Sequence, residues 1–447
     1  MTQVFALHSA YGLATASAAI DAGLLPPGER VLVPFHSARV PETSTGIARN
    51  PALASLRARF DRVEDLDALL GPLHPSGWTP DEAELPLLSR LFARAWRVDP
   101  RTVELFVQSP QVAPARTLLE LFPGAPVTIV GDGLMTYSPL RVRMPHPVAA
   151  RIVRVVYADV VPGVRPLAGS PAAACVPVPP AAFRTALEET DDGSPHDAVL
   201  DRDAPTALVL GQYLAALGLM TADEELALQE RLIDRALEWS PRRIVFRPHP
   251  SAPPQLTRAL RARAEARGVA FAEHTGAVPA ELLARRLDAR VVVAGFSTAL
   301  PTVRALYGIP IASAGTRDVL ARLAPFENSN RIPATIVDAL TRSESAPDAE
   351  ELQLLVDAVG YAMQPVVAAH LRDRAEQLLA TITPADRARY FDARRLAELG
   401  LPGAPAGTAL QRLLRPAGGV GRVEEWRLTA LGARRRVGRA WKAIRGR

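Results

Sequence analysis

Short apolar runs alternate with helix-like stretches in two separate parts of this chain, and the alternation constrains the fold more than any other feature. In the second half, strand-like runs lie at 207–210, 243–246, 269–272 and 290–294, separated by helix-like stretches at 222–239, 254–267 and 279–287. Runs this short suit buried strands, and helices between strands suit the crossover connections of a parallel sheet.

The first half shows the same rhythm, with strand-like runs at 4–7, 30–34, 103–108 and 127–130 and helix-like segments at 13–22 and 82–95. Between the halves, the stretch from Val160 to Pro205 is rich in Pro, Ala, Gly and Asp, which indicates an interdomain linker. We therefore predict an α/β protein with two Rossmann-like domains facing a cleft. The predicted parts are an N-terminal domain at 1–185, a linker at 186–205, a second domain at 206–385 and a helical extension at 386–447.

Two strand-to-helix junctions in the second half carry side chains suited to an anion. Arg247-Pro248-His249-Pro250 ends one strand, because proline cannot extend a central strand. At the next junction, Gly295 supplies the turn, and Ser297 and Thr298 precede a helix at 299–307. Ligands bind at the carboxyl edge of such sheets, where a helix N-terminus favours negative charge. Each junction alone suits an ordinary turn or cap, but their joint order predicts a nucleotide-binding half-domain.

Composition excludes several classes of protein. With 447 residues, 48% hydrophobic and 22% charged, the chain can build two substantial cores. It begins without a basic leader and has no apolar run of membrane-spanning length, so we expect a cytoplasmic location. The single Cys175 excludes an internal disulfide and any multi-cysteine metal site. The absence of G-x-G-x-x-G, P-loop and H-E-x-x-H motifs leaves dehydrogenase, P-loop and zinc-peptidase functions unsupported.

Positive charge is concentrated at the end of the chain. The segment from Trp426 to Arg447 holds eight basic residues and no acid, so removing its +8 from the total of +5 leaves −3 for the rest. Val437, Trp441 and Ile444 recur at helical spacing, which predicts an amphipathic helix on an anionic membrane surface, peripheral to the inner face of the cell membrane. A solvated basic tail or a nucleic-acid tether is the alternative for this segment. For the protein as a whole we expect no nucleic-acid partner.

In these motifs the chain resembles the bacterial sialyltransferase and alpha-2,8-polysialyltransferase families of the GT-B type. Those families share two acids followed by glycine, then His-Pro, then a pair of hydroxyl residues. His249-Pro250 corresponds to the second motif and Ser297-Thr298 to the third. Residues 278–283 resemble the ribose-binding segment of the family, and Gly211-Gln212 resembles its first nucleotide loop. The resemblance extends over most of residues 1–340.

The resemblance implies an inverting glycosyltransferase that moves sialic acid, or a related nonulosonic acid, from a CMP-activated donor to a glycan hydroxyl. It implies that Asp132 is the general base and that His249 donates to the leaving phosphate. The implied ligands of the nucleotide sugar are Gly211, Gln212, Arg247, Pro250, Glu281, Ser297 and Thr298. The CMP-sugar is a substrate, so we expect no cofactor. No carboxylate cluster suits a metal, so we expect none.

The first motif departs from the family pattern. Gly131-Asp132-Gly133 follows the strand at 127–130, and Gly131 occupies the position of the first acid. Asp191-Asp192-Gly193 matches the letters better but lies in the linker with no strand before it. We therefore place the base at Asp132. The loss of one acid predicts either impaired catalysis or a shifted range of acceptors.

Two alternatives follow from the same residues. Kdo transferases and polyol-phosphate transferases of this fold also carry His-Pro and serine-rich phosphate sites, so the donor could be CMP-Kdo or a polyol phosphate. A noncatalytic nucleotide-sugar-binding or membrane-associated assembly protein would explain Gly131. Release of CMP from CMP-sialic acid in the presence of a sialylated acceptor separates the three.

The basic tail generates a prediction that is independent of catalysis. A chain that ends at Glu425 should fold normally but lose salt-sensitive binding to anionic vesicles, because it lacks the +8 segment and its aromatic anchors. Vesicle co-sedimentation at low and high salt measures this. Full-length protein that ignores anionic vesicles at low salt would contradict it.

Overall fold

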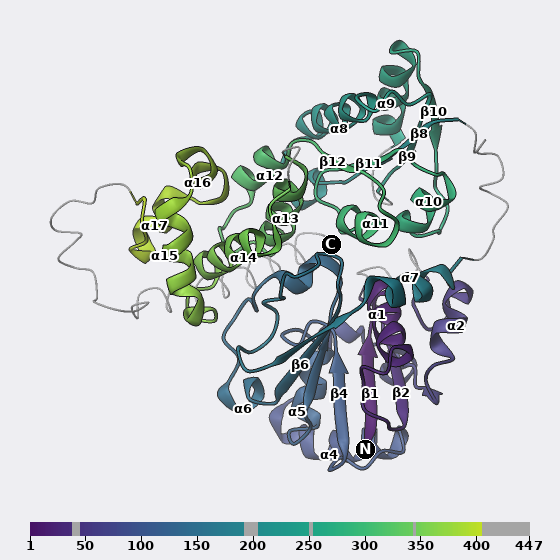
Figure 1. The fold of residues 1–447 in the computed structure, drawn as a ribbon. Helices are drawn as coiled ribbons and strands as arrows, with labels where there is room; N and C mark the ends of the chain where they lie inside the picture. Colours follow the sequence, from purple (N-terminus) through teal and green to yellow (C-terminus); the bar gives the residue numbers. More distant parts are fainter. Residues whose placement is uncertain (38–44, 192–203, 250–253, 343–345, 405–447) are drawn as a thin grey trace, which may run out of the picture.

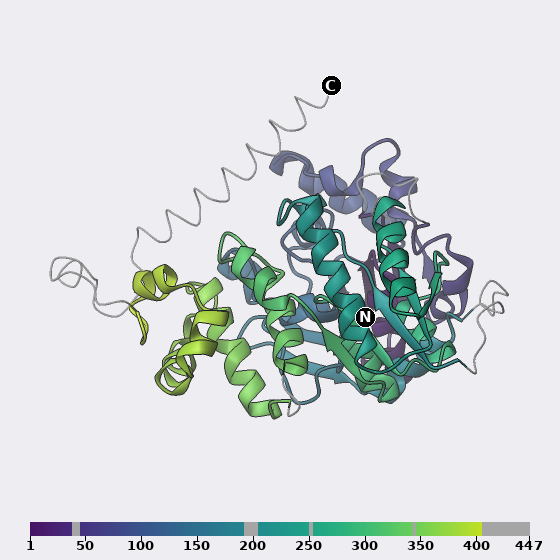
Figure 2. The same cartoon turned by 90° about the horizontal axis from the view of Figure 1, so that it is seen from above.

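Two parallel sheets, each covered by helices on both faces, make up the chain (Figure 1). The computed structural model describes residues 1–37, 45–191, 204–249, 254–342 and 346–404. Figure 2 shows the C-terminal lobe lying over the N-terminal lobe, with the last described helices extending to one side. This arrangement confirms the prediction of an α/β protein with two Rossmann-like lobes.

The N-terminal sheet has seven parallel strands in the order β3-β2-β1-β4-β5-β6-β7. The strands are β1 (Thr2–Leu7), β2 (Arg30–Pro34), β3 (Arg62–Val63), β4 (Val103–Val107), β5 (Val127–Val130), β6 (Ile152–Ala158) and β7 (Ala174–Val178). Every residue of β4 and β5 is buried, as expected for strands that have helices on both faces. The strand order reverses between β1 and β4, and ligands of open α/β sheets bind beside such a switch point.

The helices of this lobe begin with α1 (Ala10–Asp21), an alanine-rich helix that is capped by the Ser9 side chain and buried over most of its length. The others are α2 (Ala54–Arg57), α3 (Leu66–Leu70), α4 (Leu85–Ala95), α5 (Ala115–Leu121), α6 (His146–Ala149) and α7 (Pro180–Glu188), with the 3₁₀ turns η2 (Pro51–Leu53), η3 (Pro75–Gly77), η4 (Glu82–Glu84) and η5 (Gly133–Tyr137).

The C-terminal sheet repeats the same order with five parallel strands, β10-β9-β8-β11-β12. These are β8 (Thr206–Leu210), β9 (Arg243–Arg247), β10 (Ala270–Glu273), β11 (Val291–Ala294) and β12 (Ile311–Ser313). Side chains alternate between the two faces of a strand. Ala207 and Val209 of β8 therefore enter the outer core, whereas Leu208 and Leu210 enter the core that faces the other lobe.

The helices of this lobe are α8 (Ala222–Leu237), α9 (Pro254–Ala266), α10 (Ala280–Arg286), α11 (Ala299–Tyr307), α12 (Thr316–Arg322) and α13 (Arg331–Thr341), with the 3₁₀ turn η7 (Ala215–Leu217). A capping box of Thr221 and Glu224 starts α8. The chain continues as α14 (Ala349–Met363), η8 (Ala369–Leu371), α15 (Arg372–Thr381), α16 (Pro384–Tyr390) and α17 (Ala393–Leu399). Buried Asp338 of α13 accepts hydrogen bonds from Arg389 and Tyr390, which ties α16 to the lobe.

The two lobes are packed together rather than merely linked. Helix α7 lies between α1 of one lobe and α11 of the other (Figure 1). Helix α14 reaches back to the N-terminal lobe, where the Gln353 side chain accepts from the Arg165 N–H at 2.5 Å. One hydrophobic cluster runs from Val4 through both lobes to Leu401. Burial of shared apolar surface therefore holds the lobes in register.

Most predicted elements are observed, and three have the predicted bounds: β2, β5 and α11. The interpretation of 160–205 as linker is wrong for its first part, which contains β7 and α7. Strand β7 pairs with β6, so Pro177 sits in an edge strand, where its missing N–H costs no ladder bond. The boundary predicted at residue 185 falls inside α7.

The predicted basic tail, Trp426 to Arg447, lies outside the described residues. Within the described ranges, no helix combines the length and apolarity that a membrane crossing requires.

Candidate functional site

The N-terminal switch point holds a chain of hydrogen bonds that ends on Asp132. The Ser9 hydroxyl, after β1, donates to Asp132 Oδ1 at 2.8 Å. Gln108, after β4, donates from Nε2 to Ser9 Oγ at 2.9 Å, and its Oε1 accepts the backbone N–H groups of His8 and Ser9. Loops from three strands therefore converge on the carboxylate of Asp132.

The direction of the Ser9 hydroxyl is fixed by its other partners. Its oxygen accepts from Gln108 Nε2 and from the Gly12 N–H at 3.0 Å. A hydroxyl has two acceptor positions and one donor. Since both acceptor positions are filled by N–H groups, the single proton of Ser9 is left for Asp132. Hydrogen bonding to a carboxylate favours its charged form and fixes its orientation.

Gly12 leaves the space that this network needs. A Cβ on residue 12 would lie 2.2 Å from Gln108 Nε2. Gln108 itself is 1% exposed, so its amide cannot move away into solvent. Any larger residue at position 12 would therefore displace Gln108 and break its bond to Ser9.

Packing explains the glycine where the family motif has its first acid. A Cβ on Gly131 would lie 2.9 Å from Thr136 Oγ1 and 2.9 Å from Tyr157 Cβ. Thr136 Oγ1 already accepts the Asp132 N–H at 2.7 Å and so shapes the turn that carries Asp132. No acidic side chain fits at position 131 without displacing β6, which leaves Asp132 as the carboxylate of this motif.

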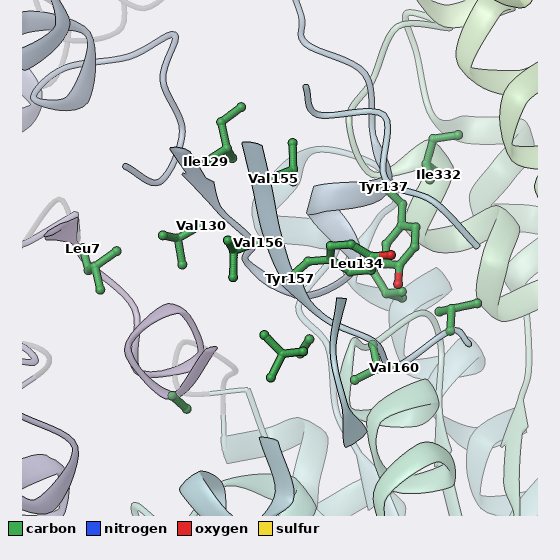
Figure 3. Packing of buried hydrophobic residues seen from close by; sticks show 14 of the residues in the cluster. Leu7, Ile129, Val130, Leu134, Tyr137, Val155, Val156, Tyr157, Val160 and Ile332 are labelled. Carbon is green, nitrogen blue, oxygen red and sulfur yellow. The ribbon is translucent and has the colours of Figure 1, made fainter. Parts of the chain in front are cut away.

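The turn η5, which follows Asp132, is anchored on the other lobe. The Leu134 N–H donates to Thr298 Oγ1 at 3.3 Å, and the Ser138 hydroxyl donates to the Ser329 carbonyl at 3.0 Å. Figure 3 shows Leu134 and Tyr137 of η5 gathered with Tyr157, near Ile332 of α13. The Asp132 loop thus joins the two lobes.

The switch point of the C-terminal sheet lies between β8 and β11, and Gln212 spans it. Gln212 Oε1 accepts the Phe296 N–H at 3.1 Å, and a Cβ on Gly295 would lie 2.1 Å from the same oxygen. The buried Glu225 carboxylate accepts the Leu214 and Ala215 N–H groups at 2.8 Å each. The loop after β8 is therefore fixed beside the hydroxyl pair.

Arg247, at the end of β9, braces the segment that leads into α10. Its guanidinium donates to the carbonyls of Val278 and Gly276, the latter at 3.4 Å. Burial raises the pKa of Glu281, while its own backbone N–H and Arg247 lower it. Burial and the Arg247 guanidinium lower the pKa of the adjacent His274. Arg247 thus contributes positive charge beside Glu281 and shapes the loop before it.

The other predicted residues occupy distinct positions. His249 is exposed at the end of β9, and Pro250 lies outside the described residues. Ser297 lies just before Thr298, the N-cap of α11, and its Oγ accepts the Ala299 N–H at 3.2 Å. The Asp191 carboxylate is engaged by the Arg286 guanidinium of α10, and Asp192 and Gly193 lie outside the described residues. Asp191 is therefore held in an ion pair rather than presented as a base.

Tyr11 lies near both the predicted base, Asp132, and the predicted ribose ligand, Glu281, and both carboxylates affect its pKa. Burial raises the pKa of Tyr11, and the charges of Glu281 and Asp132 raise it further. Tyr11 belongs to α1, so a group of the N-terminal lobe lies within electrostatic reach of the predicted base and of the predicted ribose ligand. His8 lies close to the same base: burial lowers the pKa of His8, and the charge of Asp132 opposes this shift.

Sequence reasoning missed Ser9, Gln108 and Tyr11. Ser9 lies two residues after the strand predicted at 4–7, and Gln108 is the last residue of the strand predicted at 103–108. Both therefore lie at a strand end, which is the signal that drew attention to His249 and Ser297. Their contact depends on β1 and β4 being neighbours, which the order of elements along the chain does not reveal. Tyr11 carried no signal, because it lies two residues before the helix predicted at 13–22, and only the observed helix α1 includes it.

A small cavity of about 150 Å³ opens beside the Asp132 carboxylate. Its lining includes Gln111 and Ser138 from the N-terminal lobe and Ser329 from the other. Arg141 stands at this cavity and donates to Ser329 Oγ at 3.0 Å. Asp132 is therefore one of the residues that line a cavity built from both lobes.

The described residues contain no group of three His, Cys, Asp or Glu side chains that could hold a metal ion.

Two Rossmann-like lobes, docked so that the carboxyl edges of their sheets meet at Asp132 and the hydroxyl pair, define the GT-B architecture. A sequence model described as alpha-2,8-polysialyltransferase matches residues 3–316. This match covers well over half of the chain, and the chain therefore belongs to the alpha-2,8-polysialyltransferase family. It is a glycosyltransferase, and this class uses a nucleotide-sugar donor and a glycan acceptor.

Solved structures similar to this chain include two glycosyltransferases and an epimerase. A glycosyltransferase from Rickettsia africae is 10% identical over 83% of this chain and 93% of its own, with a TM-score of 0.40. A UDP-glucosyltransferase from Polygonum tinctorium is 12% identical over 89% and 97%, with a TM-score of 0.41. The UDP-GlcNAc 2-epimerase of Methanocaldococcus jannaschii is 9% identical over 70% and 82%, also at 0.41. No match is found among curated proteins.

The Ser9 network generates a test of the Asp132 site. Ser9→Ala removes the donor to Asp132 and leaves Gln108 Nε2 without its acceptor, so transfer should fall roughly 10- to 100-fold, the worth of a charge-assisted hydrogen bond. Ser9→Thr keeps the hydroxyl and should restore much of the rate. Ser17→Ala is the matched control, because it removes another buried hydroxyl of α1 that bonds only Leu56 O. Ser9→Ala with wild-type turnover would show that Asp132 needs no such support.

The lowered pKa of His274 predicts that the free energy of unfolding depends on pH. Burial and the Arg247 guanidinium hold the pKa of His274 in the folded protein below the ordinary value of 6.5, near which the unfolded chain takes up a proton. The unfolded state therefore binds more protons below that pH, and the free energy of unfolding should fall as the pH drops. Urea unfolding at about pH 7.5 and about pH 5.5 measures the loss, which should be smaller in His274→Gln. An equal loss in both proteins would contradict the assignment.

Proposed function

We propose that this protein transfers sialic acid, or a related nonulosonic acid, from a CMP-activated donor to a glycan hydroxyl, with inversion and without a metal ion. The observation that carries the proposal is the oriented Asp132 carboxylate, which receives the Ser9 proton at 2.8 Å and lies at the junction with the hydroxyl pair. Family membership supports glycosyl transfer.

Asp132 acts as the general base in this proposal. Ser9 occupies Oδ1, and the other carboxylate oxygen is free of that constraint and can receive the proton of an acceptor hydroxyl. A base must lie within hydrogen-bonding reach of the proton that it removes. The cavity beside Asp132 gives an acceptor hydroxyl a route to it. Attack from this side on a sugar bound by the other lobe gives inversion.

The leaving phosphate is placed at the C-terminal edge. As the bond between the anomeric carbon and the phosphate oxygen breaks, the sugar becomes oxocarbenium-like and the electron pair goes to the departing phosphate, where negative charge grows. The α11 N-terminus and the Ser297 hydroxyl supply hydrogen-bond donors there, and exposed His249 supplies the proton. Glu281 is assigned to the ribose, and Gly211 and Gln212 are assigned to the nucleotide loop. No metal is assigned, because these groups meet the phosphate charge.

The packing around Gly131 helps to decide between an active enzyme and a noncatalytic binding protein. The space beside Gly131 is filled by Thr136 and Tyr157, so the missing acid is part of a well-packed turn that still presents Asp132. This favours an active enzyme with one carboxylate over a noncatalytic binding protein. The CMP-Kdo and polyol-phosphate alternatives change the donor but keep every residue assigned here, so a donor panel decides between them.

Paired variants test the proposed mechanism. Asp132→Asn keeps the size but not the basicity of the side chain, and should abolish transfer while CMP binding by calorimetry is retained. His249→Ala should lower transfer by ~10²- to 10⁴-fold, as expected for loss of a general acid. Asp191→Asn is the control carboxylate, because Asp191 is bound in an ion pair with Arg286, and its transfer rate should stay near wild type.

The same assay with CMP-sialic acid and CMP-Kdo identifies the donor by release of CMP in the presence of a glycan acceptor. Wild-type turnover in both Asp132→Asn and His249→Ala would contradict the mechanism. Binding of CMP without release from any activated sugar would favour the noncatalytic alternative.

A further inference from the structure

The two hydroxyls of the Ser297-Thr298 pair serve different partners. Ser297 Oγ stays within its own helix turn, where it accepts the Ala299 N–H at 3.2 Å. Thr298 Oγ1 accepts the Leu134 N–H from the other lobe at 3.3 Å. The pair therefore does not present two equivalent donors to one phosphate.

Gly133 makes the contact between Thr298 and η5 possible. A Cβ on residue 133 would lie 2.4 Å from Thr298 Cγ2 and 2.9 Å from Thr298 Oγ1. The backbone of Gly133 also has a φ of +57°, a conformation that glycine adopts without strain. Two separate constraints thus require glycine next to the base: the positive φ of its backbone and the close approach of Thr298.

The loop that carries Asp132, from Gly131 to Ser138, is held together by its own contacts and by contacts to the C-terminal lobe. Leu134 is fully buried, and Tyr137 of the same turn is 1% exposed. Thr136 Oγ1 binds the Asp132 N–H, and the Ser138 hydroxyl binds Ser329 O in the C-terminal lobe. Because Leu134 is buried and its turn is hydrogen-bonded to Asp132, a displacement of Thr298 would also displace Asp132.

We propose that Thr298 is a positioning residue that ties the Asp132 loop to the N-terminus of α11, and that Ser297 alone of the pair contacts the donor phosphate. This inference rests on the proposed function for the roles of Asp132 and Ser297. In physical terms, the C-terminal lobe, which binds the nucleotide in this proposal, also sets the position of Asp132. Catalytic alignment then depends on the Leu134–Thr298 hydrogen bond and the close Gly133 contact, supported by the Ser138–Ser329 bond at the end of η5.

Three variants separate positioning from donor binding. Thr298→Val keeps the methyl against Gly133 but removes the acceptor for Leu134 N–H, so kcat should fall roughly 3- to 10-fold, the worth of one hydrogen bond, with CMP affinity unchanged. Thr298→Ser keeps the acceptor and should keep kcat within about twofold of wild type. Ser297→Ala should weaken CMP binding measured by calorimetry.

A measurement independent of activity accompanies the kinetics. Hydrogen exchange of the Leu134 amide should become faster in Thr298→Val and stay at the wild-type rate in Ser297→Ala, because only the first variant removes its acceptor. Thr298→Ala is a second variant, for use if valine disturbs folding. It also removes the acceptor and leaves room for water beside the Leu134 amide, so exchange of that amide should become faster. Faster exchange in Thr298→Ala, with melting temperature near wild type, also supports the proposal.

Two results would overturn the proposal. One is a loss of CMP affinity in Thr298→Val equal to that in Ser297→Ala, which would make Thr298 a donor ligand. The other is unchanged Leu134 exchange in both Thr298 variants. Failure of the proposed function is distinct from either result: a protein inactive with every donor would still show the variant-specific change in Leu134 exchange if Thr298 holds the loop.

Discussion

The structure depends on a close approach between the Asp132 loop of one lobe and the N-terminus of α11 in the other. This approach needs glycine at position 133, where a Cβ would fall 2.4 Å from Thr298. It is supported by the apolar packing of Leu134 and Tyr137, which belongs to a core continuous through both lobes. Because η5 is shared by the lobes, the position of Asp132 is set by both sheets at once.

Within the N-terminal lobe, the orientation of Asp132 follows from the hydrogen bonds of the Ser9 hydroxyl, whose acceptor positions are both occupied. Two N–H groups fill its acceptor positions, and its proton has one remaining partner. This arrangement also explains how the site keeps an oriented carboxylate although Gly131 replaces an acid of the family motif. The turn at Gly131 is packed against Thr136 and Tyr157, so the departure from the motif belongs to a consistent local structure.

The alternation of apolar and helical segments predicted a parallel sheet in each half of the chain and the bounds of β2, β5 and α11. It did not predict β3, β6 or β12. It failed at β7, because Pro177 and the surrounding small residues suggested a linker, whereas an edge strand tolerates proline. The strand-end rule predicted Asp132, His249 and Ser297 as site residues, and these assignments stay predictions. It could not find the Ser9–Gln108 bond or the Thr298–Leu134 bond, because each joins residues about 100 or more positions apart through strand order and lobe packing.

The central claim is that the donor lies on the C-terminal sheet edge with its phosphate between Ser297 and His249, facing Asp132. A crystal structure of the full chain with CMP bound tests it most directly. The account predicts the phosphate at the N-terminus of α11, in contact with Ser297 and within reach of His249, and the ribose at Glu281. Thr298 should still hold the Leu134 N–H in that complex. A nucleotide bound elsewhere, or a phosphate held by Thr298 with η5 displaced, would contradict the account.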